Sequence, residues 1–217
     1  MSTNYRPLSG QKIALAVTGG IAAYKAADLA SKLAQAGARV NALLTPSATQ
    51  FITPLSFQSV TGQEAYTDAA LWGAQSHVLH VGMGHTADLM IIAPATANTI
   101  ARLAHGLADN LLTVAALAAH CPLLVAPAMD GGMYAHPATQ ANLETLRQRS
   151  VRILGPASGH LASPGRGGPR SRARQGVAPA RGLGGGADAV GPGGDHEGRA
   201  RHRSPPPAGP PRPAAGL

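Results

Sequence analysis

The sequence predicts an α/β protein with a three-layer, doubly wound parallel sheet of the flavodoxin or Rossmann type, and two observations carry this prediction. Short, almost wholly apolar runs occur at residues 12–18, 38–45, 88–93 and 122–126, as expected of parallel strands buried on both faces. Segments with apolar residues at helical spacing lie between these runs. Such alternation is typical of right-handed βαβ crossovers.

The first elements follow directly from this pattern. Residues 12–18 (KIALAVT) form a strand, Gly19 and Gly20 a turn, residues 21–36 a helix that Gly37 stops, and residues 38–45 a second strand. Short helices are expected at residues 46–51 and 54–60, because each has proline in its first turn. Residues 64–79 show no clear period and are predicted to be irregular.

The second half repeats the alternation. Strands at 88–93 and 122–126 each end in an Ala-Pro-Ala turn, helices are expected at 97–107, 110–119 and 137–149, and a fifth strand at 151–154. In an open α/β sheet, ligands bind beyond the carboxyl ends of the strands. The turns at residues 94–99 and 127–134 are therefore expected to line the site.

The charge of the chain is unevenly distributed. Residues 1–163 contain nine Lys and Arg against seven Asp and Glu, whereas the last 54 residues contain nine Arg against three acids. Those 54 residues also hold 14 of the 27 Gly and 10 of the 18 Pro. We therefore expect one near-neutral domain at residues 1–163, followed at 164–217 by a disordered Gly/Pro/Arg-rich tail.

Cysteine content and apolar stretches indicate a cytoplasmic protein. The single cysteine, Cys121, allows no intrachain disulfide. The first residues show no apolar core of a secretory signal, and the stretch at 111–119 is too short to span a bilayer.

Three local patterns are candidates for chemistry, and each has an ordinary structural interpretation. Gly19 and Gly20 let backbone N–H groups approach an anion at a helix N-terminus, but a tight turn without a ligand explains them equally. The spacing matches neither G-x-G-x-x-G nor a Walker A loop.

His77, His80 and His85 form the second pattern, and the hydroxyl, amide and carboxyl groups of the two strand-end turns form the third. Histidine suits proton transfer, whereas these spacings make a poor metal-ligand set, so no metal is expected. Thr96, Asn98, Thr99 and Asp130 suit ligand binding, and helix capping explains them as well.

Taken together, the motifs resemble those of the homo-oligomeric flavin-containing cysteine decarboxylases. The resemblance rests on TGGIAAYK, on HVGMGHTADLMIIAPATANTIARLAHGLADNLLT and on PAMDGGMY, in that order, and covers residues 10–163. It implies FMN as the cofactor and His80 as the catalytic histidine, eight residues before the Asp that opens the third predicted strand. It implies a catalytic role for Asp130 as well, and substrate contacts for Asp130 and Met133. It implies FMN contacts for Gly20, Ile21, Ala22, Thr45, Ser47, Thr96, Ala97, Asn98, Thr99 and Ala128.

The resemblance also implies the reaction and the assembly. The substrate would be 4′-phospho-N-pantothenoylcysteine, which is oxidised to a thioaldehyde, loses CO₂ and is reduced to 4′-phosphopantetheine in coenzyme A biosynthesis. The flavin would do the electronic work, and His80 would manage proton transfer during the oxidation. The protein would form a trimer or a trimer-based dodecamer, with no membrane partner and no nucleic acid.

Two positions depart from the family pattern. Asp130 stands where the family has an Asn that binds the substrate carboxylate, and an ionised Asp can only accept hydrogen bonds. It would need a proton, or would bind the backbone or the substrate amide instead. Ser163 stands where the family has a lid cysteine, which leaves the reductive half-reaction without its usual acid; Cys121 precedes a buried strand and is expected to be a packing thiol.

The resemblance ends at Ser163, and two interpretations of the tail compete. One is an Arg/Gly-rich nucleic-acid arm. The other, which we favour, is a frameshift, because codons for residues 194–198 and 200–205, read one base later, permit a segment resembling the start of a fused phosphopantothenate–cysteine ligase domain.

Other functions remain open at this stage. One alternative is a catalytically impaired, FMN-binding regulatory subunit, and another is an oxidative decarboxylase that releases an enethiol because the lid cysteine is absent. A flavin prenyltransferase shares the architecture but has no need of PAMDGGMY.

Overall fold

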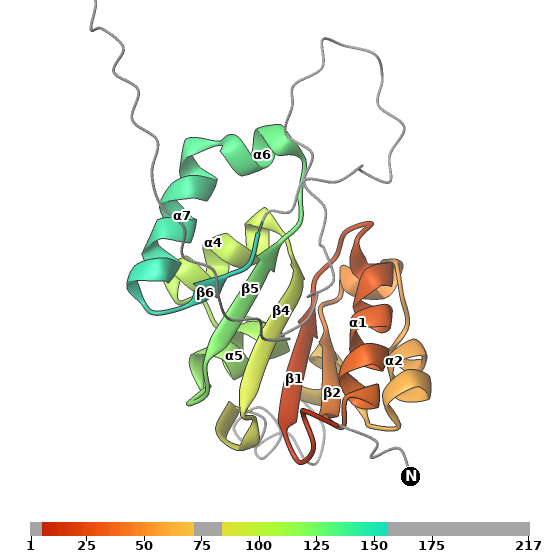
Figure 1. The fold of residues 1–217 in the computed structure, drawn as a ribbon. Coiled ribbons are helices and arrows are strands. Elements are labelled where there is room, and N and C mark those ends of the chain that lie inside the picture. The colour runs from red at the N-terminus through yellow and green to blue at the C-terminus, as the bar shows by residue number, and fades with distance from the viewer. Residues whose placement is uncertain (1–5, 72–83, 156–217) are drawn as a thin grey trace, which may run out of the picture. The chain divides into compact units, whose positions relative to one another are not determined.

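The computed structural model describes residues 6–71 and 84–155, and these residues build a six-stranded, fully parallel sheet (Figure 1). The strand order is β3-β2-β1-β4-β5-β6. The strands are β1 Lys12–Val17, β2 Arg39–Leu44, β3 Ala65–Thr67, β4 Leu89–Ala95, β5 Leu123–Pro127 and β6 Arg152–Ile153. The predicted doubly wound fold is confirmed, with β1 and β4 as the central neighbours from which the chain winds in opposite directions.

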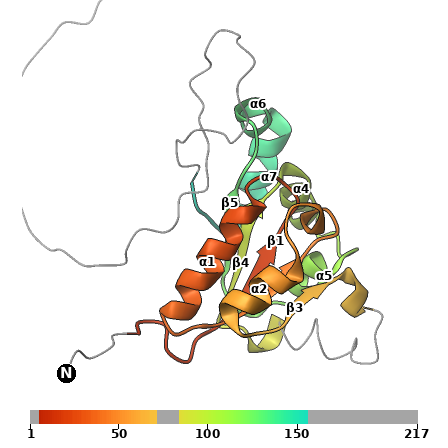
Figure 2. The same ribbon diagram turned by 90° about the vertical axis from the view of Figure 1, so that its right-hand side faces the viewer.

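Helices cover both faces of the sheet, as Figure 2 shows in the turned view. The helices are α1 Ala23–Gln35, α2 Pro54–Thr61, α4 Ala97–His105, α5 Leu111–Leu117, α6 Gly131–Ala135 and α7 Pro137–Gln148, with 3₁₀ turns η1 Ala48–Gln50 and η2 Asp68–Leu71. Helices α1 and α2 pack on one face around Leu15, Val17 and Phe57. Helices α4, α5 and α7 pack on the other face, where Ile92, Ile100 and Leu143 are fully buried.

The strand side chains explain why the sequence carries no polar alternation. Leu15 and Val17 of β1 join the core under α1, whereas Ala14 and Ala16 join the core under α4 and α5. Burying both faces of a strand requires apolar residues at every position, and this arrangement stabilises the centre of the sheet. The continuous apolar run thus reflects a central parallel strand.

The structure differs from the sequence-based expectation in four places. Residues 65–67, expected to be irregular, form the edge strand β3, and residues 131–135 form α6, which was not predicted. The segment at 46–51 forms only the three-residue turn η1, and β4 continues two residues beyond the predicted end. Short or half-buried elements carry too few apolar positions to show a period.

The ends of the helices follow local chemistry. Helix α1 ends before Gly37, which has φ +99°, as the sequence indicated. Helix α2 begins at Pro54 and α7 at Pro137, where the missing N–H costs nothing. No helix within the described ranges is both long and apolar enough to cross a membrane.

Candidate active site

A polar cavity of about 260 Å³ lies at the carboxyl ends of the central strands. Its walls come from the turns after β1, β2 and β4, from η2 and from the loop between α4 and α5. It is lined by Gly19, Thr45, Pro46, Ser47, Asp68, Thr96, Asn98, Thr99, Arg102, Asp109 and Asn110. The cavity adjoins the point where the winding reverses between β1 and β4, as the predicted fold required.

The turn after β1 is held close to the turn after β2. A Cβ added to Gly19 would lie 2.3 Å from Cβ of Ser47 and 2.6 Å from its carbonyl carbon, so only glycine fits there. Gly20 has room, since the nearest atom to its hypothetical Cβ is Cγ2 of Thr96 at 3.9 Å. Close packing of the two turns therefore explains why residue 19 is glycine. Residue 20 has space around it, so its backbone N–H can still be approached by an anion.

The turn after β4 begins a helix that points its N-terminus at the cavity. Thr96 is the N-cap of α4, and its hydroxyl accepts a hydrogen bond from the Thr99 N–H at 3.4 Å. The two hydroxyls lie 3.2 Å apart. Capping and ligand binding are compatible here, because the helix dipole and the remaining N–H groups favour an anion at the same end.

Three charged residues, Asp68, Arg102 and Asp109, also line the cavity. Arg102 of α4 is the one cation among the described lining residues, and it pairs with Asp109. Asp68 of η2 accepts a hydrogen bond at 3.0 Å from the N–H of Leu111, the first residue of α5. These acids therefore have partners within the protein, and the cavity presents mainly neutral donors and one compensated cation.

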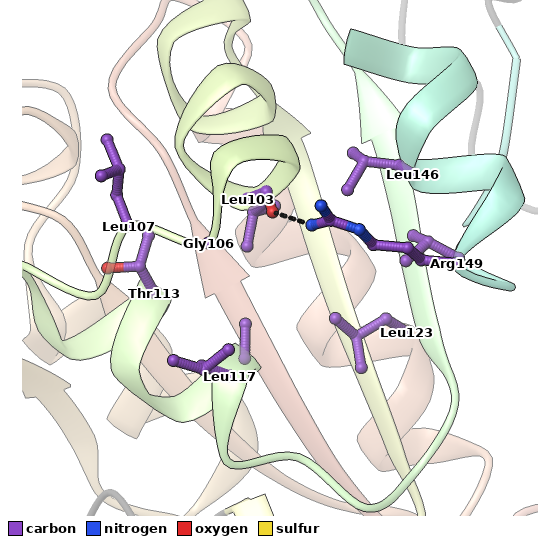
Figure 3. A pocket seen from close by; sticks show the side chains of 10 residues that line it. Leu103, Gly106, Leu107, Thr113, Leu117, Leu123, Leu146 and Arg149 are labelled. Atoms are coloured by element: carbon purple, nitrogen blue, oxygen red, sulfur yellow. Dashed lines mark hydrogen bonds between the residues drawn. The ribbon is translucent and has the colours of Figure 1, made fainter.

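A second cavity, shown in Figure 3, provides a contrast. It measures about 210 Å³, lies between α4, α5, α7 and β5, and has leucine walls that include Leu103, Leu117 and Leu123. The Arg149 guanidinium donates to the Leu103 carbonyl at 3.4 Å. Because its walls are almost wholly apolar, this cavity does not suit a phosphorylated ligand, whereas the cavity at the strand ends does.

The cavity brings together only part of the residue set that the sequence indicated. Thr45, Ser47, Thr96, Asn98 and Thr99 line it, and Ala97 lies between them as the first residue of α4.

The remaining predicted residues lie around the cavity or outside the description. Gly20 adjoins Thr96, while Ile21 is 55% exposed and Ala22 is the N-cap residue of α1. Ala128 donates its N–H to the Ala95 carbonyl at 2.9 Å, which joins the turns after β4 and β5. His77 and His80 lie outside the described residues.

Asp130 and Met133 belong to α6 rather than to the cavity wall. Asp130 is the N-cap, and its Oδ1 accepts the Gly132 N–H at 2.7 Å. An ionised Asp130 was expected to bind either the backbone or the substrate amide, and the structure contains the hydrogen bond to the backbone. Met133 is 52% exposed and so is free to contact a ligand.

Cys121 is a weaker nucleophile in this fold than an exposed cysteine would be. Its side chain is half-buried against the core under α4 and α5. Burial raises the pKa of the thiol, and the nearby Asp88 carboxylate adds to this effect, while backbone hydrogen bonds oppose it. The expectation of a packing thiol agrees with this environment.

The remaining histidines offer no metal centre in the part of the chain that the structure describes. His85 contacts His120 with 4.3 Å between ring centroids, on the side of the sheet where β4 and β5 begin. No group of three or more His, Cys, Asp or Glu side chains within residues 6–71 and 84–155 is arranged to hold a metal ion.

Sequence reasoning missed Thr18, Asp68, Arg102, Asp109 and Asn110. Asn110 forms a capping box with Thr113, which its position before an apolar run could have indicated. Asp68 and Leu111 are 43 residues apart in sequence, so no local signal could have placed them together.

Fold and site together define a doubly wound α/β protein with a polar, hydroxyl-lined cavity at the point where the winding reverses. The chain belongs to the Flavoprotein family, whose model matches residues 1–171. It is 46% identical over 155 residues to the coenzyme A biosynthesis bifunctional protein CoaBC of Bacillus subtilis, a match that covers 71% of this chain and 38% of that protein. The chain thus spans about two fifths of the length of this curated relative.

Solved structures of decarboxylases are also similar to this chain, and the matches cover most of each solved chain. A PPC decarboxylase variant in which a cysteine is replaced by serine, complexed with pantothenoylaminoethenethiol, is 33% identical, with a TM-score of 0.63 and coverage of 70% of this chain and 85% of that one. The FMN-dependent cysteine decarboxylase SpaF is 34% identical, with a TM-score of 0.62 and coverage of 67% and 84%.

Proposed function

We propose that this chain binds FMN and decarboxylates 4′-phospho-N-pantothenoylcysteine to 4′-phosphopantetheine, a carbon–carbon lyase step of coenzyme A biosynthesis. The observation that carries the proposal is the coverage of 85% of a PPC decarboxylase chain by residues that also build the cavity at the strand ends. The 46% identity to a bifunctional coenzyme A biosynthesis protein supports the same pathway.

The chemistry of the cavity fits the phosphate and polyol parts of FMN. The hydroxyls of Thr45, Ser47 and Thr96 and the amide of Asn98 are neutral partners for a ribityl chain. The N-terminus of α4 and the open backbone at Gly20 suit the phosphate. When bound, FMN supplies a reversible two-electron acceptor, which the side chains of this protein cannot provide.

The protein would contribute position and protons. We assign proton transfer to His80, which lies outside the described residues, on the family resemblance. Asp130 and Met133 follow β5 and would contact the substrate from α6. Since Asp130 already accepts the Gly132 N–H through Oδ1, we assign Oδ2 to the substrate amide N–H rather than to the carboxylate.

A second candidate has its own supporting observation. The solved decarboxylase with a cysteine-to-serine change holds pantothenoylaminoethenethiol, an enethiol. This sequence has Ser163 where the resemblance places the lid cysteine. A chain with serine at this position would decarboxylate the substrate and release the enethiol instead of the reduced product, and the two electrons would pass through FMN to an external acceptor such as O₂.

Assembly, location and extent are part of the proposal. We infer a trimer, or a dodecamer built of trimers, in the cytoplasm. Ile21 and Tyr24 support a covering subunit, because these large side chains beside the site are 55% and 54% exposed. Residues 164–217 are proposed to be a frameshifted tail; resequencing the locus and finding no inserted or missing base before Pro164 would contradict this.

The test uses the full chain. The purified protein should be yellow and should release FMN on denaturation, and its reaction with phosphopantothenoylcysteine should be followed for CO₂, reduced product and enethiol. CO₂ with reduced product supports the lyase, and CO₂ with enethiol supports the second candidate. Bound FMN without CO₂ would identify an impaired or regulatory subunit, and a colourless protein would overturn the proposal.

His80→Asn provides the matched control for this assay. The variant should retain FMN and its visible spectrum but release no CO₂, because the amide preserves polarity without titrating near neutral pH. Undiminished turnover would remove His80 from the mechanism.

A further inference from the structure

Thr18 is a buried residue outside the predicted site that joins the two central strands at the cavity. It follows β1 directly and is 1% exposed. Its hydroxyl donates to the Pro94 carbonyl at 2.7 Å and accepts the Thr96 N–H at 3.0 Å. Its own N–H donates to the same Pro94 carbonyl at 3.3 Å. Three hydrogen bonds from one residue thus tie the end of β1 to the end of β4.

These hydrogen bonds fix two walls of the cavity relative to each other. On one side, Thr18 precedes Gly19, whose backbone lies against Ser47 without space for a side chain. On the other side, Thr96 is the N-cap of α4 and accepts the Thr99 N–H. Loss of the Thr18 hydrogen bonds would therefore let the glycine turn and the helix N-terminus move independently.

The hydroxyl of Thr18 donates one hydrogen bond and accepts one within the protein. A threonine hydroxyl has one proton to donate, and that proton is directed at Pro94. Its acceptor capacity receives the Thr96 N–H, and the side chain is closed off from solvent. The residue therefore acts on a ligand only through the groups that it positions, and does not contact the ligand itself.

We propose that Thr18 is a positioning residue that sets the affinity for the phosphate end of the flavin by holding the Gly19–Gly20 turn against the N-terminus of α4. This inference rests on the proposed FMN-binding function. This buried hydroxyl is costly to replace, because its loss leaves the Thr96 N–H without its acceptor and leaves the Pro94 carbonyl with only the Thr18 backbone N–H.

The decisive comparison is Thr18→Val against Thr18→Ser in the full chain. Valine keeps the shape and removes both side-chain hydrogen bonds, whereas serine keeps the hydroxyl. Thr18→Val should weaken FMN binding, measured by flavin fluorescence, by about tenfold or more. Thr18→Ser should restore the affinity to within about threefold of the natural protein, and the kcat of flavin-saturated protein should follow the same order.

Thr113→Val is the matched control. Thr113 is also 1% exposed, and its hydroxyl also both accepts and donates, from the Asn110 N–H at 3.2 Å and to the Asn110 carbonyl at 3.1 Å. The Asn110 side chain would still accept the Thr113 N–H, because that donor is backbone. Thr113→Val should lower the urea midpoint as Thr18→Val does, yet leave FMN affinity within about threefold.

The outcomes separate this inference from the proposed function. If Thr18→Val lowers stability as Thr113→Val does and FMN affinity is unchanged in both, Thr18 is merely structural and the inference is overturned. If Thr18→Val does not fold, Thr18→Cys replaces it with the same expectation, because a thiol is a much weaker donor and acceptor.

If the natural protein binds no flavin, the proposed function fails and the positioning role is still decided. Hydrogen exchange at the Thr96 and Thr99 amides would then be compared in the flavin-free variants. Faster exchange in Thr18→Val than in Thr18→Ser would support the positioning role, and equal exchange would overturn it.

Discussion

The same tripeptide stands at the ends of two strands of this protein, and the turns that follow lead into different structures. Ala-Pro-Ala closes β4 at residues 93–95 and β5 at residues 126–128. After β4, the neutral Thr96 caps the nine-residue α4, and Thr18 braces the turn from the neighbouring strand. After β5, the exposed carboxylate of Asp130 caps the five-residue α6 through its own side chain.

The difference shows that the position of a strand in the sheet decides how many hydrogen bonds neighbouring strands make to the turn that follows it. Strand β4 lies between β1 and β5. At its end, Pro94 accepts from the Thr18 hydroxyl, Thr96 donates to that hydroxyl, and Ala95 accepts from the Ala128 N–H. Beyond β5 lies only the two-residue β6. In the proposed function, the turn after β4 would contact the cofactor and the turn after β5 the substrate.

The largest effect on stability should come from forcing the turn after β1 away from the turn after β2. Gly19→Ala would place a Cβ 2.3 Å from Cβ of Ser47, so the turns after β1 and β2 must separate, at a cost of about 2–3 kcal/mol in the free energy of unfolding. Gly20→Ala, whose Cβ has 3.9 Å of clearance, is the control. Urea unfolding of both variants measures the difference, and equal midpoints would contradict the close packing of the two turns.

The next effect compares the two caps directly. Thr96→Ala removes the cap of a helix whose Ile100 and Ala104 are buried, and should lower the free energy of unfolding by about 1–2 kcal/mol. Asp130→Ala removes the cap of a short helix with exposed residues, and should cost only about 0.5 kcal/mol. Urea midpoints in parallel give the order, and a larger loss at Asp130 would reverse the comparison.

The smallest effect on stability should come from Asp130→Asn, because both residues cap helices equally well. The free energy of unfolding should change by less than about 0.5 kcal/mol. Asn loses the acceptor that we assign to the substrate amide N–H. Its NH₂ group can instead donate to the neighbouring substrate carboxylate and carries no repelling charge, so the KM for phosphopantothenoylcysteine should fall about tenfold with kcat little changed.

Inhibition by 4′-phosphopantetheine provides the control for this variant. The product has no carboxylate but retains the amide N–H assigned to Oδ2 of Asp130, so its inhibition constant should not fall in Asp130→Asn as the KM of the substrate does. An equal KM for the substrate in both proteins would place its carboxylate away from residue 130.

The central fold was predictable because burial on both faces leaves a continuous apolar run in the sequence. Strands β1, β4 and β5 were found in this way. The edge strand β3 has three half-buried residues, Ala65–Thr67, and its existence depends on pairing with β2 rather than on its own pattern. Helix α6 was missed because five residues that include two glycines have almost no helical signal of their own.

The site residues that stand at the carboxyl ends of predicted strands could be found from the sequence. Thr45, Ser47 and Thr96 stand at strand ends, so the strand order alone places them at one cavity. Thr18 and Asp68 could not be recognised, because their partners Thr96 and Leu111 lie 78 and 43 residues away in sequence. Their importance arises from tertiary contacts that leave no local signature.

The environment of Cys121 has a practical consequence for labelling. The chain has a single cysteine, and burial raises the pKa of its thiol, so little thiolate is present near neutral pH. A cysteine introduced at an exposed position such as Ala135 on α6 should therefore react with maleimide much faster than Cys121. A fluorescent reporter can be attached beside the turn after β5 without first removing the natural cysteine.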